Sequence, residues 1–325
     1  MTRPIDLSMN EMPFPPPEQV VTAARAGLAL LHRYAGQRQL DELRALLSRY
    51  TGVPQSYIVP GPGSDYLLRE IIYAFSGGRK VIMVSPSFMP TVQKAKQFAT
   101  KLVSLRLSPP AFRLHPDMLW DELTEPALVI IDNPNNPTGT VLLDRTTVEA
   151  LVAREDVRLV IDEAYFEFSG VTFADMIVDH PNLAITRTLD KAFSLAGARI
   201  GYLIAGAPFR DVFAAFRALL PQTSLHAAIA ALQSASYMED NVRVIIAERD
   251  RLHDRLIGLH VPVYSSHTNF LLASTGISDI ASRLREQGVV VSDVSNQCAE
   301  GSIRISIGRP EENDAFIDAL RTILD

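Results

Sequence analysis

The chain has 325 residues, enough for two domains and a large hydrophobic core. Its net charge of −6 argues against non-specific nucleic-acid binding, because no basic excess is present to neutralise phosphates. The single cysteine, Cys298, excludes a disulfide within the chain and is typical of a reducing cytoplasm. The first residues lack the apolar region of a secretory signal, and no apolar run reaches the roughly 18 residues of a membrane-spanning helix.

The first quarter of the chain is predicted to begin as an extended arm and to continue as helices. Residues 13–18 include four prolines, which exclude a regular helix or a central strand. Gly52 is placed to end the second helix, and Ser64 or Asp65 can cap the third. The expected helices cover residues 19–31, 40–50 and 66–75.

Short apolar runs then alternate with helical segments. Several runs are continuous rather than alternating, which is typical of strands buried on both faces of a sheet. The expected strands cover residues 81–84, 102–105, 128–131, 159–161, 183–188 and 201–204. Helices are expected over residues 91–98 and, capped by Asp144, 145–153. This order predicts an α/β fold whose mainly parallel sheet is flanked by helices.

The last third has a different pattern. Two long helices are expected over residues 208–220 and 224–257. They are followed by a mixed set of elements at residues 269–273 (strand), 277–286 (helix), 289–291 and 303–307 (strands) and 313–324 (helix). We interpret this set as a smaller α+β domain, which the N-terminal arm joins in space. The predicted large domain is 33–236, and the predicted small domain combines 1–32 with 237–325.

Three polar segments follow apolar runs of the expected sheet. They are Asn133-Pro-Asn-Asn-Pro-Thr-Gly139, Asp162-Glu-Ala-Tyr165 and Thr188-Leu-Asp-Lys-Ala-Phe-Ser-Leu-Ala-Gly-Ala-Arg199. Open α/β sheets bind ligands at the carboxyl ends of their strands. A lysine able to form a Schiff base (Lys191), an aspartate, a tyrosine and an arginine suited to phosphate are the groups that a pyridoxal-phosphate site needs.

In this order and spacing, the segments resemble fold-type I pyridoxal-phosphate-dependent aminotransferases of class I/II, in the histidinol-phosphate aminotransferase-like branch. The resemblance runs over nearly the whole chain, from Asn10 to Asn313. It implies a seven-stranded type of sheet, pyridoxal 5′-phosphate as cofactor, no metal, and a cytoplasmic homodimer with shared active sites. The implied partners are a small amino donor and an oxo acceptor.

The resemblance also implies roles for individual residues. Lys191 would bind the cofactor as a Schiff base and then move a proton between the substrate and the cofactor. Asp162 would pair with the pyridine nitrogen, and Phe88 would stack on the ring. Tyr165 and Asn136 would form hydrogen bonds to the cofactor's O3′ oxygen.

The phosphate and the substrate need further groups. Gly63, Ser64 and Asp65 precede or open a helix, where backbone amides can face an anion. By resemblance, Arg199 binds the phosphate and Tyr34 reaches it from the neighbouring subunit.

The strand around Arg304 alternates, so this arginine shares a face with Ser302 and Ser306. An inward arginine on a strand needs an anion. The resemblance identifies that anion as the substrate carboxylate, and it places Asn136 at the substrate as well.

The chain departs from the family at Asp190, where serine or threonine is usual. A carboxylate beside a phosphate is repulsive, so Asp190 is expected to turn away or to be protonated. Thr188, Ser64 and Arg199 would then carry the phosphate. We expect looser cofactor binding than usual, and tighter binding in Asp190→Ser.

The sequence is compatible with three functional hypotheses. The first is an aminotransferase. The second is a decarboxylase resembling threonine-phosphate decarboxylase, a relative that tends to have phenylalanine where this chain has Tyr165. The third is a non-catalytic protein that holds pyridoxal phosphate, against which the complete set of site residues argues. A dehydrogenase is excluded because no dinucleotide-binding fingerprint is present.

Overall fold

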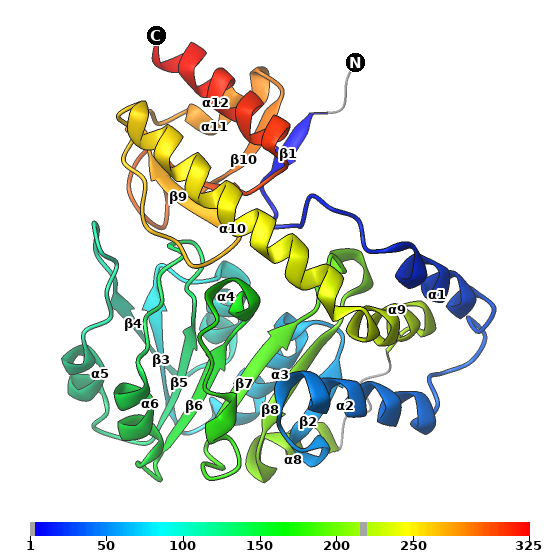
Figure 1. Cartoon of the computed structure of the whole chain (residues 1–325). Coiled ribbons are helices and arrows are strands. Elements are labelled where there is room, and N and C mark those ends of the chain that lie inside the picture. The colour runs from blue at the N-terminus through cyan, green and yellow to red at the C-terminus, as the bar shows by residue number, and fades with distance from the viewer. Residues whose placement is uncertain (1–3, 215–219) are drawn as a thin grey trace.

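A seven-stranded sheet forms the centre of the larger part of the molecule (Figure 1). The computed structural model describes residues 4–214 and 220–325. In spatial order the strands are β2 (Ile58–Gly61), β8 (Gly201–Ala205), β7 (Leu183–Thr188), β6 (Val157–Asp162), β5 (Ala127–Asp132), β3 (Lys80–Ser85) and β4 (Lys101–Arg106). Only β8 runs against its neighbours, so the predicted mainly parallel sheet is confirmed.

The sequence analysis predicted six of these strands and missed β2. This strand is short and lies at the edge of the sheet, where it pairs with β8. It contains Pro60, which an edge strand tolerates and a central strand does not. The proline is unfavourable for a strand pattern in the sequence, although the edge position accommodates it.

Helices cover both faces of the sheet. They are α2 (Gln37–Thr51), α3 (Ser64–Phe75), α4 (Met89–Phe98), α5 (Pro116–Glu122), α6 (Arg145–Val152), α7 (Phe166–Ser169), α8 (Ala207–Ala214), α9 (Gln222–Gln233) and α10 (Ala235–Gly258). Alternate residues of β3 enter two separate cores. Val81 and Met83 pack with α3, and Ile82 and Val84 belong to the core that includes α2. This explains the uninterrupted apolar runs.

Several predicted helix ends need correction. The helix predicted over 224–257 is two helices, which meet at Ser234. The cap of α3 is Gly63, without a side-chain bond, so the prediction of a Ser64 or Asp65 cap was wrong. Asp144 does cap α6, because its Oδ1 accepts from the Thr147 N–H at 2.7 Å. The helix predicted over 208–220 is α8 up to Ala214 and then falls in part outside the described residues.

A second sheet lies above the first in Figure 1, and α10 extends between them. Its order is β1 (Ile5–Leu7), β10 (Val289–Asp293), β11 (Ser302–Ser306) and β9 (Phe270–Ser274), with α11 (Ile280–Glu286) and α12 (Pro310–Leu324) beside it. The arm joins this sheet through β1, a strand that the sequence analysis did not predict. After the arm, α1 (Glu18–Leu28) packs on α9. The domain boundaries at 33 and 237 stay a prediction.

Candidate active site

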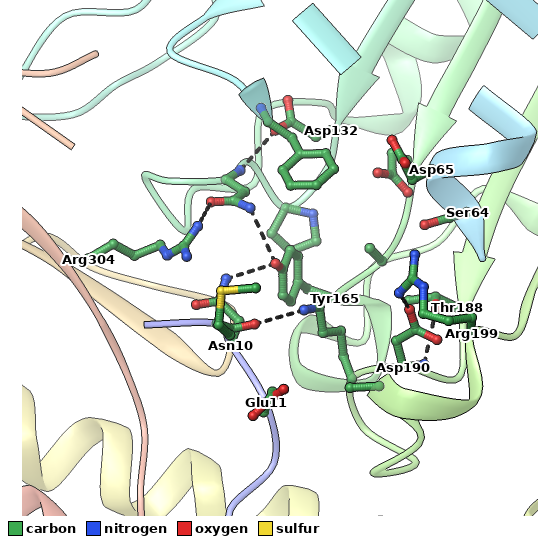
Figure 2. Close-up of a pocket in the computed structure, with 18 residues that line it drawn as sticks. Asn10, Glu11, Ser64, Asp65, Asp132, Tyr165, Thr188, Asp190, Arg199 and Arg304 are labelled. Atoms are coloured by element: carbon green, nitrogen blue, oxygen red, sulfur yellow. Dashed lines mark hydrogen bonds and ion pairs between the residues drawn. The ribbon is translucent and has the colours of Figure 1, made fainter. Parts of the chain in front are cut away.

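The carboxyl ends of β5, β6 and β7 open into one cavity of about 520 Å³, a volume within the usual range for small-molecule sites. The N-terminal arm and β11 contribute to the opposite wall (Figure 2). Most of the predicted site residues line this cavity. They are Ser64, Asp65, Phe88, Asn136, Asp162, Tyr165, Thr188, Lys191, Arg199 and Arg304.

Two predicted residues do not line it. Gly63 lies just behind the wall at a φ of +89°, and a Cβ there would lie 2.8 Å from the Arg199 Nη2 atom. Its own N–H donates to the Gly61 carbonyl at 2.9 Å, so this amide is not free to bind a phosphate. The lack of a side chain at Gly63 instead leaves space for the Arg199 guanidinium. Tyr34 lies on the surface with 81% of its area exposed. Its predicted role, in the site of a neighbouring subunit, stays a prediction.

Asp162 ends β6 and is buried at the bottom of the cavity. Its Oδ1 accepts from the hydroxyl of Thr186, its register partner on β7, at 2.9 Å. Burial raises the pKa of Asp162 to about 7, although the Thr186 hydrogen bond opposes the shift. A neighbouring cation would stabilise the charged form of this buried carboxyl. A protonated ring nitrogen is such a cation.

Asp132 is the corresponding residue of β5, directly opposite Asp162 in the sheet, and the sequence analysis missed it. Its two oxygens accept hydrogen bonds from the Ser87 hydroxyl, the Phe88 N–H, the Asn135 side chain and the Asn136 N–H, at 2.9–3.3 Å. Burial raises the pKa of Asp132, and these donors oppose the shift. Asp132 therefore holds Phe88 and Asn136 in position, and both were predicted to contact the cofactor.

Tyr165 lies at the centre of a polar network. Its hydroxyl oxygen accepts from the side-chain amides of Asn136, at 3.3 Å, and Asn10, at 2.9 Å. With two donors at the oxygen, the hydroxyl hydrogen can be donated to a ligand. Burial raises the pKa of Tyr165 to about 12, which keeps the hydroxyl protonated. Asn10 has a φ of 53° and is itself fixed by Ser306, whose hydroxyl donates to its Oδ1 at 3.1 Å.

Arg304 projects from β11 into the cavity. Its Nη1 donates to Asn136 Oδ1 at 2.7 Å, and its Nη2 donates to the Ser8 carbonyl at 2.6 Å. Among the described residues no carboxylate pairs with it, and its buried Nε has no hydrogen-bond partner. An arginine that has only neutral partners is suited to bind an added anion.

Lys191 is enclosed between the large sheet and the arm. Its Nζ donates to the Met9 carbonyl at 3.0 Å. The loss of bulk water lowers the pKa of Lys191 to about 8, and nearby Asp190 opposes this effect while Arg304 and Arg199 add to it. A lysine with this pKa has a much larger neutral, nucleophilic fraction near physiological pH than an ordinary lysine.

The end of the cavity away from Arg304 holds the N-terminus of α3, Arg199 and Asp190 (Figure 2). Arg199 has a φ of 54°, and its guanidinium forms an ion pair with the Asp190 carboxylate. Asp190 itself lines the cavity beside Arg199, so it does not turn away from this end of the site, and its protonation stays a prediction. The Thr188 hydroxyl donates to the Ile200 carbonyl at 3.1 Å and accepts from the Asp190 N–H at 3.0 Å. Its hydrogen is therefore engaged within the loop.

The missed residues differ in the signals they carry. Asp132 ends the run Val-Ile-Ile-Asp, much as Asp162 ends Leu-Val-Ile-Asp, so the pattern offered a direct signal. Asn10 and Met9 belong to the arm, and only their long-range contacts reveal their part in the site.

Residues 4–214 and 220–325 contain no group of three or more histidine, cysteine, aspartate or glutamate side chains able to hold a metal ion. Within the same ranges, no helix has the length and apolar character needed to cross a membrane.

Comparisons with known proteins agree with this geometry. The profile of the family "Aminotransferase class I and II" matches residues 2–320. A histidinol-phosphate aminotransferase from Sulfurisphaera tokodaii is 36% identical over 99% of this chain and 90% of its own length. A second, from Archaeoglobus fulgidus, is 36% identical over 98% and 99%. Among solved structures, the Sinorhizobium meliloti histidinol-phosphate aminotransferase in complex with pyridoxal 5′-phosphate has a TM-score of 0.86 and 26% identity, over 98% and 90%.

The matches extend over the whole described sheet and over every residue of the cavity. The chain therefore belongs to the aminotransferase class I and II family, as a pyridoxal-phosphate-dependent aminotransferase of fold type I.

Proposed function

We propose that this cavity holds pyridoxal phosphate between Asp162 and the N-terminus of α3, and that the enzyme transfers the amino group of an anionic amine related to histidinol phosphate. The residues present fit the cofactor. Asp162 is a buried carboxyl with a raised pKa, which suits a pyridine nitrogen that keeps its proton. Arg199 and the start of α3 offer cationic and amide groups for a phosphate.

When bound, the cofactor acts as an electron sink for charge that develops at the substrate Cα. The chain supplies the proton chemistry around that centre. Lys191, whose pKa is about 8, is readily neutral and is the base that removes a proton from the substrate Cα. The carbonyl of Met9 accepts a hydrogen bond from the same nitrogen, so the arm helps to orient the lysine.

Arg304 is the observation that carries the substrate proposal. It lies on the same cavity as Lys191, has only neutral partners, and has one buried nitrogen without a hydrogen bond. An anionic group of the substrate, whether carboxylate or phosphate, would complete these contacts. The relatives in S. tokodaii and A. fulgidus are named for histidinol phosphate, which makes this amine the first candidate.

The test is an absorbance titration of the cofactor-loaded protein with histidinol phosphate, glutamate and other amines. We expect histidinol phosphate to bleach the visible band of the bound cofactor, and 2-oxoglutarate to restore it. Bleaching by other amines alone would replace histidinol phosphate as the donor. Release of CO2 without need for an oxo acid would indicate a decarboxylase instead.

We also infer a homodimer in the cytoplasm, in which Tyr34 of each chain completes the other's site. Exposed apolar side chains at Leu28, Leu31 and Tyr34 support an interface at this end of the molecule. Sedimentation equilibrium checks the mass, and a monomer that is fully active would contradict the shared site.

A further inference from the structure

The arginine at the phosphate end of the cavity already has an anionic partner. Asp190 precedes Lys191, is only 4% exposed, and forms an ion pair with Arg199. Its second oxygen accepts from the Ile200 N–H at 3.2 Å, so the carboxylate is anchored to the backbone and cannot simply swing away. Both residues line the cavity, beside Ser64 (Figure 2).

Arg199 pairs with Asp190 at the rim of the cavity, where about half of the arginine side chain stays exposed. Its backbone is left-handed, with a φ of 54°, and its guanidinium pairs with the Asp190 carboxylate. The guanidinium also fills the space that a side chain at position 63 would occupy. The same arginine therefore faces both its internal carboxylate and any phosphate bound at the start of α3.

The local charges do not favour a second anion. Apart from Arg199, the charged group that acts on Asp190 is the cation Lys191, the next residue of the same loop. The anion Asp65, in the first turn of α3, lines the same cavity. Once Lys191 is neutral, the guanidinium of Arg199 faces the Asp190 carboxylate and a phosphate dianion. The excess of negative charge is relieved if one proton is bound.

We propose that Asp190 and the cofactor phosphate share Arg199 with one proton between them, so that cofactor binding takes up a proton and weakens as the pH rises. This inference rests on the proposed cofactor site. Asp190 is then a positioning residue, which acts through Arg199 and sets the pH range in which the enzyme stays loaded.

The environment of Asp190 supports the proposal. Burial raises the pKa of its carboxyl, against the opposing effects of Arg199 and Lys191. An added phosphate raises that pKa further. Between the two pKa values one proton is bound with the ligand, and affinity falls about tenfold for each pH unit.

The probe is pyridoxamine 5′-phosphate, because its amine forms no Schiff base with Lys191 and the titration of the lysine therefore does not dominate the result. Equilibrium dialysis of the cofactor-free protein gives its Kd at pH values from about 6 to 9. The same series is measured for Asp190→Ser and for Asp190→Asn, which keeps the shape of the side chain and an acceptor for Ile200. Thermal melting confirms that each variant is folded.

We expect both variants to bind about tenfold more tightly than the wild type at pH 8, with the difference shrinking toward pH 6. Glu11→Gln is the matched control, since it removes one negative charge from the same cavity without touching the Arg199 ion pair. It should keep the wild-type slope. Pyridoxamine without phosphate should show no difference between wild type and the Asp190 variants.

Two results would overturn the inference. One is an unchanged slope of Kd against pH in both Asp190 variants, and the other is weaker binding of the probe by both of them at pH 8. Failure of the cofactor site itself looks different, because the wild-type protein would then bind neither pyridoxamine phosphate nor pyridoxal phosphate at any pH.

Discussion

Two arginines face the same cavity from opposite sides, and their surroundings differ (Figure 2). Arg304 comes from the small sheet and has only neutral acceptors, the Asn136 side chain and the Ser8 carbonyl. Arg199 comes from the loop before β8 and is paired with the carboxylate of Asp190. The positive charge of the first is not offset by a carboxylate, which suits the proposed role of binding a substrate anion. The second has its charge offset by the protein itself.

An arginine in a cavity is therefore not by itself a strong anion site. What counts is the charge that remains after its internal partners are included. By that measure we expect the proposed substrate end to attract anions strongly, and the proposed phosphate end to attract them weakly unless a proton is added.

Lys191 lies near both arginines, and its removal should have the largest effect. Lys191→Ala should lower kcat by at least about 10³-fold, because both the covalent link and the proton transfer depend on this amine. It should also remove the visible band of the bound cofactor. Stopped-flow assays and absorbance spectra measure both quantities. Activity within tenfold of the wild type would rule out the role of Lys191.

Arg304→Lys tests the fully charged end. We expect KM for the amino donor to rise about 10- to 100-fold, because a lysine cannot reproduce two directed hydrogen bonds to one anion. Steady-state kinetics at saturating oxo acid measure this change. Arg283→Lys, on the exposed face of α11, is the control and should leave KM unchanged. An unchanged KM in Arg304→Lys would show that the substrate anion binds elsewhere.

Arg199→Gln tests the end of the cavity at which the arginine is already paired. Its side chain is 53% exposed and already paired, so its loss should weaken pyridoxamine phosphate binding by only about tenfold. Affinity for pyridoxamine, which lacks the phosphate, should not change. The expected ranking is that Arg304 contributes more to anion binding than Arg199. It would be reversed if Arg199→Gln weakened pyridoxamine phosphate binding by a larger factor than Arg304→Lys raises KM for the amino donor.

Asp162 offers the smallest test, on stability rather than activity. Its folded pKa of about 7 lies above the ordinary value of 3.8, so the folded cofactor-free protein loses stability as the pH rises from about 4 to about 7. Asp162→Asn should remove part of this loss and raise Tm at pH 8 by a few degrees relative to wild type, with no gain at pH 4. Differential scanning calorimetry checks the sign. A lower Tm at pH 8 would show that the Thr186 hydrogen bond outweighs burial.

The sequence predicted much of this molecule because its strongest patterns are local. Continuous apolar runs predicted six strands of the large sheet, and polar residues at the ends of those runs predicted most of the cavity wall. The strands β1 and β2 were missed because each is short and is stabilised by pairing with a distant strand.

Contacts between distant segments could not be predicted in the same way. The hydrogen bond from Asn10 to Tyr165 and the four donors to Asp132 depend on how loops fold over one another. The ion pair between Asp190 and Arg199 depends on a left-handed backbone at an arginine, for which the sequence carries no clear signal.

The arm has a consequence for the order in which the protein is made. Strand β1 pairs with β10, at Ile5 and Val289, and Asn10 bonds to Ser306, which lies 296 positions further along the chain. During synthesis the amino terminus leaves the ribosome first, yet these partners emerge almost last. Residues of the arm therefore stay without these partners until β10 and β11 have been synthesised, and the cavity is complete only after that point.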